Sequence, residues 1–187
     1  MMQLITAYLL LITFFMLEFI LRKDKAAKSL DKSEADMKST YLIGLTIFLV
    51  LVLSVTFNFL HIGGFNNEII SWLGVCIMVI GLSVRIWSMK TLNKYYTRVL
   101  TTTKEQEIIK KGPYKIIRHP GYLGTMLTWS AAGLAMQNLI IFIAATCMML
   151  IAYFYRINYE EKMLVDKFGE KFNDYKKHTW RILPPVW

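Results

Sequence analysis

The sequence has little charge and few cysteines. Of its 187 residues, 19% are charged, whereas about a quarter would be charged in a soluble domain. Hydrophobic residues make up 55% of the chain and the mean hydropathy is +0.40, which excludes intrinsic disorder because disordered segments are poor in apolar residues. Cys76 and Cys147, the two cysteines, both lie inside apolar runs, and this excludes a disulfide scaffold.

Several familiar site motifs are also absent from the sequence. There is no glycine-rich dinucleotide fingerprint and no phosphate-binding loop. The histidines His61, His119 and His178 are too scattered for a metal site, so we expect no metal. The net charge of +9 would suit nucleic acid, but no nucleic-acid-binding motif accompanies it. We therefore expect no nucleic-acid partner, and the distribution of the charges indicates a membrane instead.

Five apolar stretches are present, at residues 3–21, 40–62, 69–89, 121–136 and 139–155. The first three contain 19, 23 and 21 residues, enough to cross a hydrocarbon core of about 30 Å at 1.5 Å per residue. The last two contain 16 and 17 residues and are joined only by Gln137 and Asn138, which predicts a tight helical hairpin. The predicted fold is all-α: a polytopic integral membrane protein with five transmembrane helices.

The basic residues fix the predicted orientation. Six lie between the first and second stretches, eight between the third and fourth, and seven after the fifth, which leaves only Arg85 inside a span. The opposite loops contain no lysine or arginine. The positive-inside rule then predicts an outside N-terminus and a cytoplasmic C-terminus. Nothing in the sequence indicates an oligomeric state.

The segment before the fourth stretch is the first that could have a chemical role. It is rich in glycine, proline, tyrosine and cationic groups, and reads Gly112-Pro113-Tyr114-Lys115-Ile116-Ile117-Arg118-His119-Pro120-Gly121-Tyr122-Leu123-Gly124. Pro120 suits the first turn of a helix, so His119 is expected beside free backbone N–H groups that favour an anion. The alternative is a purely structural interfacial belt of Tyr and Arg.

A second constellation follows the fifth stretch. Arg156 and Glu160 are four residues apart, so they share a helical face and either form an intrahelical ion pair or take part in a site with Glu161. An apolar stripe of Leu164, Phe168, Phe172 and Tyr175 indicates a helix on the membrane surface, interrupted at Gly169. Two further charges, Glu18 and Arg85, lie near the ends of spans, and we expect both side chains to snorkel to the interface.

In the fourth stretch, small residues at helical spacing predict close helix packing: Gly121, Thr125, Thr128, Ala132 and Ala135.

Together the two constellations resemble the isoprenylcysteine carboxyl methyltransferase (ICMT) family and, more broadly, the integral-membrane phospholipid methyltransferases. The resemblance covers roughly residues 85–185. It implies one membrane-embedded domain over 1–187, in which 1–68 form two N-terminal spans and 69–187 the catalytic core. It also implies that S-adenosylmethionine (SAM) is the methyl donor and S-adenosylhomocysteine the product, with no metal, and that a cytoplasmic C-terminal helical cap covers the donor.

Motif positions then imply individual roles. Arg156 is expected to face the acceptor and, with Glu160, to form the catalytic pair. The donor-binding residues implied by the resemblance are Gln106, Glu107, Ile108, Ile109, Tyr114, His119, Pro120, Gly121, Tyr122 and Glu160; the first four match the family only in position and apolar character. The chemistry of the donor agrees, because His119 and the helix N-terminus suit its carboxylate, Glu160 suits its ammonium, and the tyrosine rings suit its adenine or sulfonium.

The expected function is SAM-dependent methylation of a lipophilic or prenylated acceptor from the bilayer, with a carboxylate as the acceptor group. A carboxylate needs no general base, whereas a phenolic or amine lipid, the first alternative, would need one such as Glu160, Glu161 or His119. The alternative of another class is a non-catalytic membrane protein or small transporter. A transporter would be expected to show discontinuous helices in paired halves, and the sequence indicates none.

Overall fold

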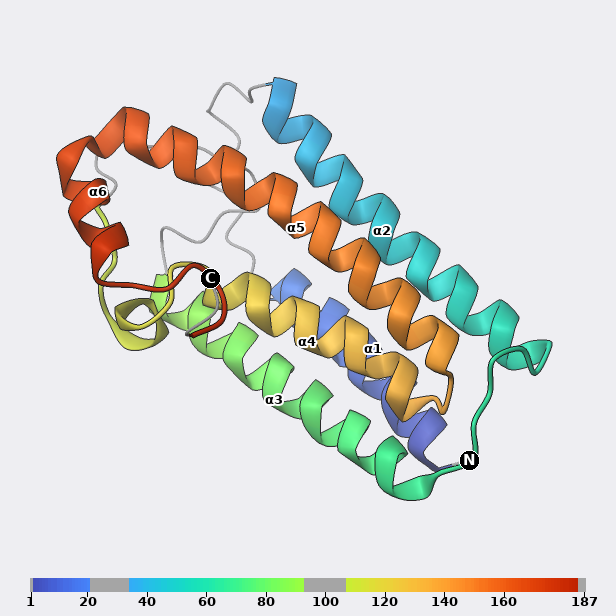
Figure 1. Ribbon diagram of the computed structural model, residues 1–187. Coiled ribbons are helices and arrows are strands. Elements are labelled where there is room, and N and C mark those ends of the chain that lie inside the picture. Colours follow the sequence, from blue (N-terminus) through green and yellow to red (C-terminus); the bar gives the residue numbers. More distant parts are fainter. Residues whose placement is uncertain (1, 21–33, 93–106, 185–187) are drawn as a thin grey trace.

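The computed structural model describes residues 2–20, 34–92 and 107–184, and these parts of the chain form helices joined by short connections (Figure 1). The helices are α1 (Met2–Ile20), α2 (Glu34–Phe59), α3 (Glu68–Leu92), the 3-10 helix η3 (Gly112–Lys115), α4 (Pro120–Ala135), α5 (Leu139–Phe168) and α6 (Glu170–Lys177). The all-α prediction is therefore confirmed for the described residues.

Four of these helices are long and apolar enough to cross a membrane: Met2–Ile20, Met37–Phe59, Glu68–Leu92 and Leu139–Phe168. The fourth predicted stretch forms α4, whose 16 residues reach about 24 Å, less than a hydrocarbon core of about 30 Å. The predicted hairpin of α4 and α5 is present, with its turn at Met136–Asn138. A fifth crossing stays a prediction.

Helix α4 is packed closely against α3 along the small residues that the sequence singled out. Gly121, Thr125, Thr128, Ala132 and Ala135 are all buried. A Cβ atom added to Gly81 on α3 would lie 2.7 Å from the carbonyl oxygen of Gly124 on α4, and one added to Gly124 would lie 2.6 Å from that of Gly81. The two backbones therefore approach so closely that only glycine fits at this crossing.

The N-terminal helices cover the other sides of α4 and α5. Helix α1 contacts α3 and α4, and its Phe14 and Phe15 meet the buried Trp129 of α4 edge to face, with ring centroids 5.8 and 5.6 Å apart. Helix α2 runs along α5 (Figure 1). Each N-terminal helix thus lies against a helix that contains predicted site residues.

Helix α5 extends well beyond the predicted apolar stretch. It continues without a break to Phe168, so its 30 residues span about 45 Å. The first part of the predicted amphipathic helix, up to Phe168, is the continuous end of α5. Gly169, with φ of +53°, ends α5 and begins α6, as the sequence predicted.

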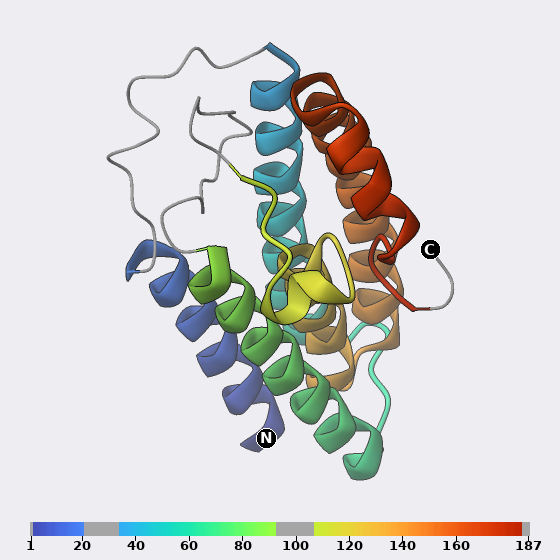
Figure 2. The same cartoon turned by 90° about the vertical axis from the view of Figure 1, so that its left-hand side faces the viewer.

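The apolar stripe after Gly169 is packed onto protein. Phe172 and Tyr175 are buried, and the Tyr175 hydroxyl donates to the carbonyl oxygen of Tyr114 in η3 over 2.5 Å. Residues 178–184, which we call the C-terminal strap, then pair with the segment before α4: Trp180 N–H donates to Ile116 O, and Arg118 N–H to Trp180 O. Figure 2 shows α6 and the strap beside the segment that precedes α4.

Candidate active site between α4 and α5

The predicted site residues of α4 and α5 meet at one end of the helical bundle. His119 is the N-cap residue of α4 and Pro120 occupies its first turn, as the sequence predicted. Arg156, Glu160 and Glu161 project from the part of α5 that passes this turn. The two constellations, separated by about 35 residues in the sequence, are thus joined by direct contacts.

Tyr122 is the residue that links the cluster. Its hydroxyl donates to Glu160 Oε2 over 2.6 Å and accepts from Arg156 Nε over 3.3 Å. Its ring stacks on the His119 imidazole, with centroids 5.5 Å apart and planes 6° apart, and meets the Tyr153 ring at 4.9 Å. The i,i+4 relation of Arg156 and Glu160 is therefore bridged by a phenol that fixes the direction of both side chains.

His119 lies between two carboxylates. Its Nε2 is 3.2 Å from Glu161 Oε1 and its Nδ1 is 3.7 Å from Glu160 Oε2, and the residue is buried. Because an ionised carboxylate only accepts hydrogen bonds, Nε2 carries a proton and Nδ1 is the nitrogen that faces Glu160. The imidazole is thus held in one orientation at the start of α4.

Glu161 is held by cations on both sides. Its Oε1 accepts from Arg118 Nε over 2.8 Å, and its Oε2 accepts from Arg181 Nε and Nη2 over 3.0 and 2.8 Å. Arg118 in turn donates to the carbonyl oxygens of Lys176 and Thr179 at the end of α6. A carboxylate with this set of partners is an anchor for the C-terminal strap and for His119, not a free general base as the sequence allowed.

Arg156 is buried, with 3% of its surface exposed. Its Nη1 donates to Ser39 Oγ over 2.7 Å and to Thr40 Oγ1 over 2.8 Å, both on α2. Sequence reasoning missed these two hydroxyls, because serine and threonine at the start of a span have many other uses. It placed Arg118 within the segment before the fourth stretch but gave it no role in the site, and it missed Arg181, a single arginine within an otherwise apolar C-terminal segment.

Tyr114 lies close enough to Glu160 for the two groups to interact electrostatically. Burial, reinforced by the nearby Glu160 carboxylate, raises the pKa of the Tyr114 phenol well above its ordinary value. The phenol is therefore neutral at physiological pH, and it remains a hydrogen-bond donor and an aromatic surface. Its position in η3 is fixed from outside by the hydrogen bond from Tyr175.

Residues 106–109 are the part of the predicted donor site that matches the family only in position and apolar character. Gln106 lies outside the described residues, Glu107 is exposed, and Ile108 and Ile109 are half-buried. Among the residues that the structure describes, no hydrogen bond or ring contact links Glu107, Ile108 or Ile109 to the cluster around Tyr122. Their role stays a prediction.

The sequence predicted that Glu18 and Arg85 each snorkel to the interface. In the structure the two side chains pair with each other instead. Arg85 Nε and Nη2 lie 2.7 and 2.6 Å from Glu18 Oε1, and the two side chains are 13% and 18% exposed. A Cβ atom on Gly121 would lie 3.0 Å from Arg85 Nη1. The α1–α3 ion pair therefore borders the first turn of α4. Pairing the two charges lowers the free-energy cost of placing them at membrane depth.

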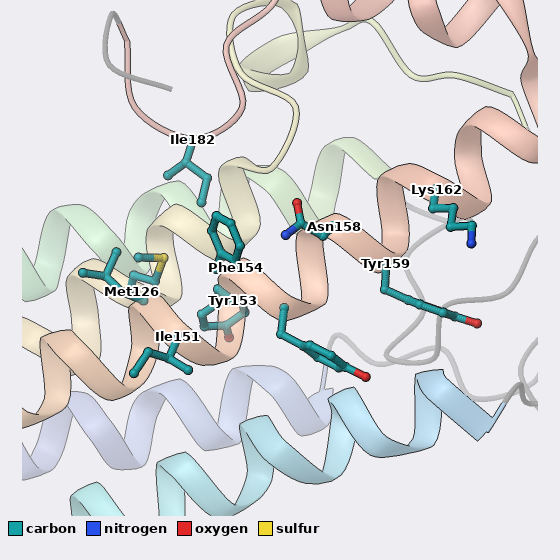
Figure 3. A pocket seen from close by; sticks show the side chains of 10 residues that line it. Met126, Ile151, Tyr153, Phe154, Asn158, Tyr159, Lys162 and Ile182 are labelled. Carbon is teal, nitrogen blue, oxygen red and sulfur yellow. The ribbon is translucent and has the colours of Figure 1, made fainter.

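An apolar cavity of about 820 Å³ adjoins the cluster. Met126 of α4, Ile182 of the strap and a series of α5 side chains line it, among them Tyr153, Phe154, Asn158 and Tyr159 (Figure 3). Tyr153 belongs to both features, because its ring also contacts Tyr122. The cavity thus adjoins the polar cluster through the Tyr153 ring.

The fold and the site define an all-helical integral membrane protein with a buried polar cluster beside an apolar cavity. A model of the "Isoprenylcysteine carboxyl methyltransferase (ICMT) family" matches residues 72–166. This segment covers half of the sequence and includes α4, Arg156, Glu160 and Glu161. The chain belongs to this family.

Individual relatives agree with this assignment. The chain is 29% identical to a protein-S-isoprenylcysteine O-methyltransferase of Dictyostelium discoideum over 117 residues. The aligned residues cover 62% of this chain and 49% of the relative. It is 31% identical over 120 residues to the Saccharomyces cerevisiae protein of the same name, 60% and 48% of the two chains. A methanethiol S-methyltransferase of Pseudomonas deceptionensis is 36% identical over 74 residues, 39% of this chain and 27% of the relative. The matches to these isoprenylcysteine methyltransferases span about half of their length.

The fold also resembles a solved structure, described as the eukaryotic intramembrane Ras methyltransferase ICMT. The TM-score is 0.65 at 18% identity, over 93% of this chain and 62% of the solved one. At this identity the likeness concerns the arrangement of the helices.

Proposed function

We propose that this protein is a SAM-dependent methyltransferase that methylates a lipophilic acceptor taken from the bilayer, with a carboxylate as the acceptor group. The observation that carries the proposal is the direct contact network of His119, Tyr122, Arg156 and Glu160. Beside this network lies the apolar cavity that Tyr153 shares with it. Both features belong to a chain of the ICMT family.

The residues of the cluster fit the chemistry of the donor. SAM supplies an electrophilic methyl group on a sulfonium, and it also carries an ammonium, a carboxylate and an adenine. The Glu160 carboxylate suits the ammonium, and the neutral ring of Tyr114 and the ring of Tyr122 offer surfaces for a cation or for adenine. In the first turn of α4, Pro120 has no N–H group, so the donor that we assign to the carboxylate is the backbone N–H of Gly121. We assign Tyr114, His119–Tyr122 and Glu160 to donor binding, and Gln106–Ile109 to the same site by position.

The acceptor side has a different character. Arg156 suits an anionic group, and the adjoining cavity is lined mostly by apolar and aromatic side chains, together with Asn158 and Lys162. For a carboxylate acceptor, the work of the protein is to align the two reacting groups and to exclude water, with no proton to remove. The relatives named isoprenylcysteine O-methyltransferases support a prenylated substrate.

A phenolic or amine lipid is the second candidate acceptor. A relative named for methanethiol supports acceptors other than carboxylates among similar chains. Such groups lose a proton during methylation, and Glu160 is the carboxylate placed to receive it, since Glu161 is already bound by Arg118 and Arg181.

We infer that the site faces the cytoplasm. The basic segments 107–118 and 156–184 lie at the same end of the bundle (Figures 1 and 2). The charge-poor turns gather at the other end, where Asn138 Nδ2 donates to Ile62 O over 2.7 Å and Gly64 pairs with Asn138. This arrangement supports an outside N-terminus by the positive-inside rule.

The test is to incubate membranes that contain the protein with methyl-labelled SAM and to identify the labelled lipid. We expect label in a lipid fraction that mild base releases, as a methyl ester would be, and none in membranes with Glu160→Ala. Purified protein should bind SAM in a calorimeter, and Glu160→Ala should abolish that binding. A base-stable label indicates the phenol or amine alternative, and absence of both label and heat contradicts the enzyme.

A further inference from the structure

We propose that Ser39 and Thr40 of α2 are positioning residues of the site, whose hydroxyls aim the Arg156 guanidinium at the anionic group of the acceptor. The inference rests on the proposed function and assigns a task to a helix that lies outside the family-matched segment 72–166. By sequence alone, α2 is only an apolar span.

Hydrogen bonds within the described residues hold the guanidinium at Nη1 and at Nε. Nη1 has two hydrogens, and these two bonds, to Ser39 Oγ at 2.7 Å and Thr40 Oγ1 at 2.8 Å, account for both. Nε donates to the Tyr122 hydroxyl over 3.3 Å. Because the group is planar and rigid, bonds on two nitrogens fix its plane and the direction of the third.

Burial makes these bonds consequential. Ser39 is 0% and Arg156 3% exposed, and a buried charge without hydrogen-bond partners is strongly unfavourable. Removing the two hydroxyls would leave Nη1 to find other acceptors, which would rotate the guanidinium away from its present plane. The Tyr122 hydroxyl keeps its own bond to Glu160, so the donor side of the site is not expected to change.

The chemistry of the two residues suits a cation that must bind an anion. Serine and threonine hydroxyls are neutral acceptors, so these two bonds orient Arg156 without adding negative charge beside it. An aspartate at position 39 would accept the same hydrogen but would compete with the acceptor's carboxylate for the guanidinium.

The experiment compares the Ser39→Ala/Thr40→Val double variant with a matched control, Ser54→Ala. Ser54 lies on the same helix and is equally buried, but its hydroxyl donates to Val50 O of its own helix. The probe is S-farnesyl-N-acetylcysteine with methyl-labelled SAM, or the lipid identified by membrane labelling. The readouts are kcat/KM for the probe, S-adenosylhomocysteine binding by calorimetry, and the unfolding temperature in detergent.

We expect the double variant to lose on the order of tenfold or more in kcat/KM for the probe, as befits hydrogen bonds to a charged group. Its affinity for S-adenosylhomocysteine should not change, and Ser54→Ala and Thr40→Ser should behave like wild type. Ser39→Asp should suppress methylation of an anionic acceptor while it keeps the affinity for S-adenosylhomocysteine.

Two results would overturn the proposal. One is a double variant that methylates the probe as well as Ser54→Ala does. The other is a parallel loss of methylation, S-adenosylhomocysteine binding and unfolding temperature, which would make the contact a simple helix–helix brace. Failure of the proposed function itself is distinguishable, because then wild-type protein transfers no label to any acceptor.

Discussion

The Tyr122 hydroxyl donates a 2.6 Å hydrogen bond to Glu160 Oε2 and so ties the first turn of α4 to α5. The same oxygen accepts from Arg156. Donor-side and acceptor-side residues of the proposed site therefore share one phenol, and its removal should affect both.

Tyr122→Phe keeps the aromatic ring and its stacking on His119 but removes the shared oxygen. Because hydrogen bonds to charged groups contribute about 1.5–3 kcal/mol, we expect the variant to unfold more easily in detergent by about this amount. Its binding of SAM, measured by calorimetry, should also weaken. The matched control is Tyr41→Phe on the exposed side of α2, and equal behaviour of the two variants would contradict the linking role of Tyr122.

Glu161→Gln tests the anchor of the C-terminal strap. The change removes the charge that Arg118 and Arg181 share, and loss of one partner in a buried ion pair costs about 3–5 kcal/mol. We expect residues 178–184 to become sensitive to limited proteolysis and the protein to lose stability. Glu170→Gln, at an exposed position of α6, should change neither, and a strap that stays protected in Glu161→Gln would rule the anchor out.

Gly81→Ala tests the close crossing of α3 and α4. The new Cβ atom would meet the carbonyl oxygen of Gly124 at 2.7 Å, so the helices must separate at a cost of about 1–3 kcal/mol. Gly44→Ala on α2 is the matched control, because a Cβ atom there has no neighbour within 4 Å. That control should gain about 0.5–1 kcal/mol from better helix propensity; thermal unfolding of both variants separates packing from propensity.

The contact of Tyr175 with Tyr114 predicts a dependence on alkaline pH. Burial raises the pKa of Tyr175 to about 12 from its ordinary value of 10.0. The folded state therefore favours the neutral phenol, so its contribution to stability is complete below pH 10 and is lost as the pH rises through about 12. Tyr175→Phe should flatten the fall in unfolding temperature between these values, whereas Tyr41→Phe should leave it unchanged.

Much of the helical framework follows from the sequence, because apolar runs at membrane length admit few alternatives. The end of α5 does not follow in the same way. The apolar run stops at Tyr155, but the helix continues through amphipathic residues until Gly169, the first residue whose backbone leaves the helical region. Hydropathy reports where a helix meets lipid, and helix-stopping residues report where it ends.

The site follows from the sequence only in part. His119, Tyr122, Arg156 and Glu160 belong to recognisable motifs, and the structure brings them together. The pairing of Glu18 with Arg85 and the hydroxyls of Ser39 and Thr40 depend on how α1 and α2 are placed, which no local pattern encodes. Glu161 illustrates the same limit, since a neighbour of Glu160 in sequence turns out to have different partners in space.

Because α5 is continuous, it fixes the distance along its axis between the apolar cavity and the polar cluster. Ile151 in the cavity wall and Glu160 in the polar cluster stand on one unbroken helix, nine positions and therefore about 13 Å apart along its axis. A continuous helix keeps that spacing constant, so in the proposed site the distance between the apolar cavity and the polar cluster is fixed by the backbone of α5.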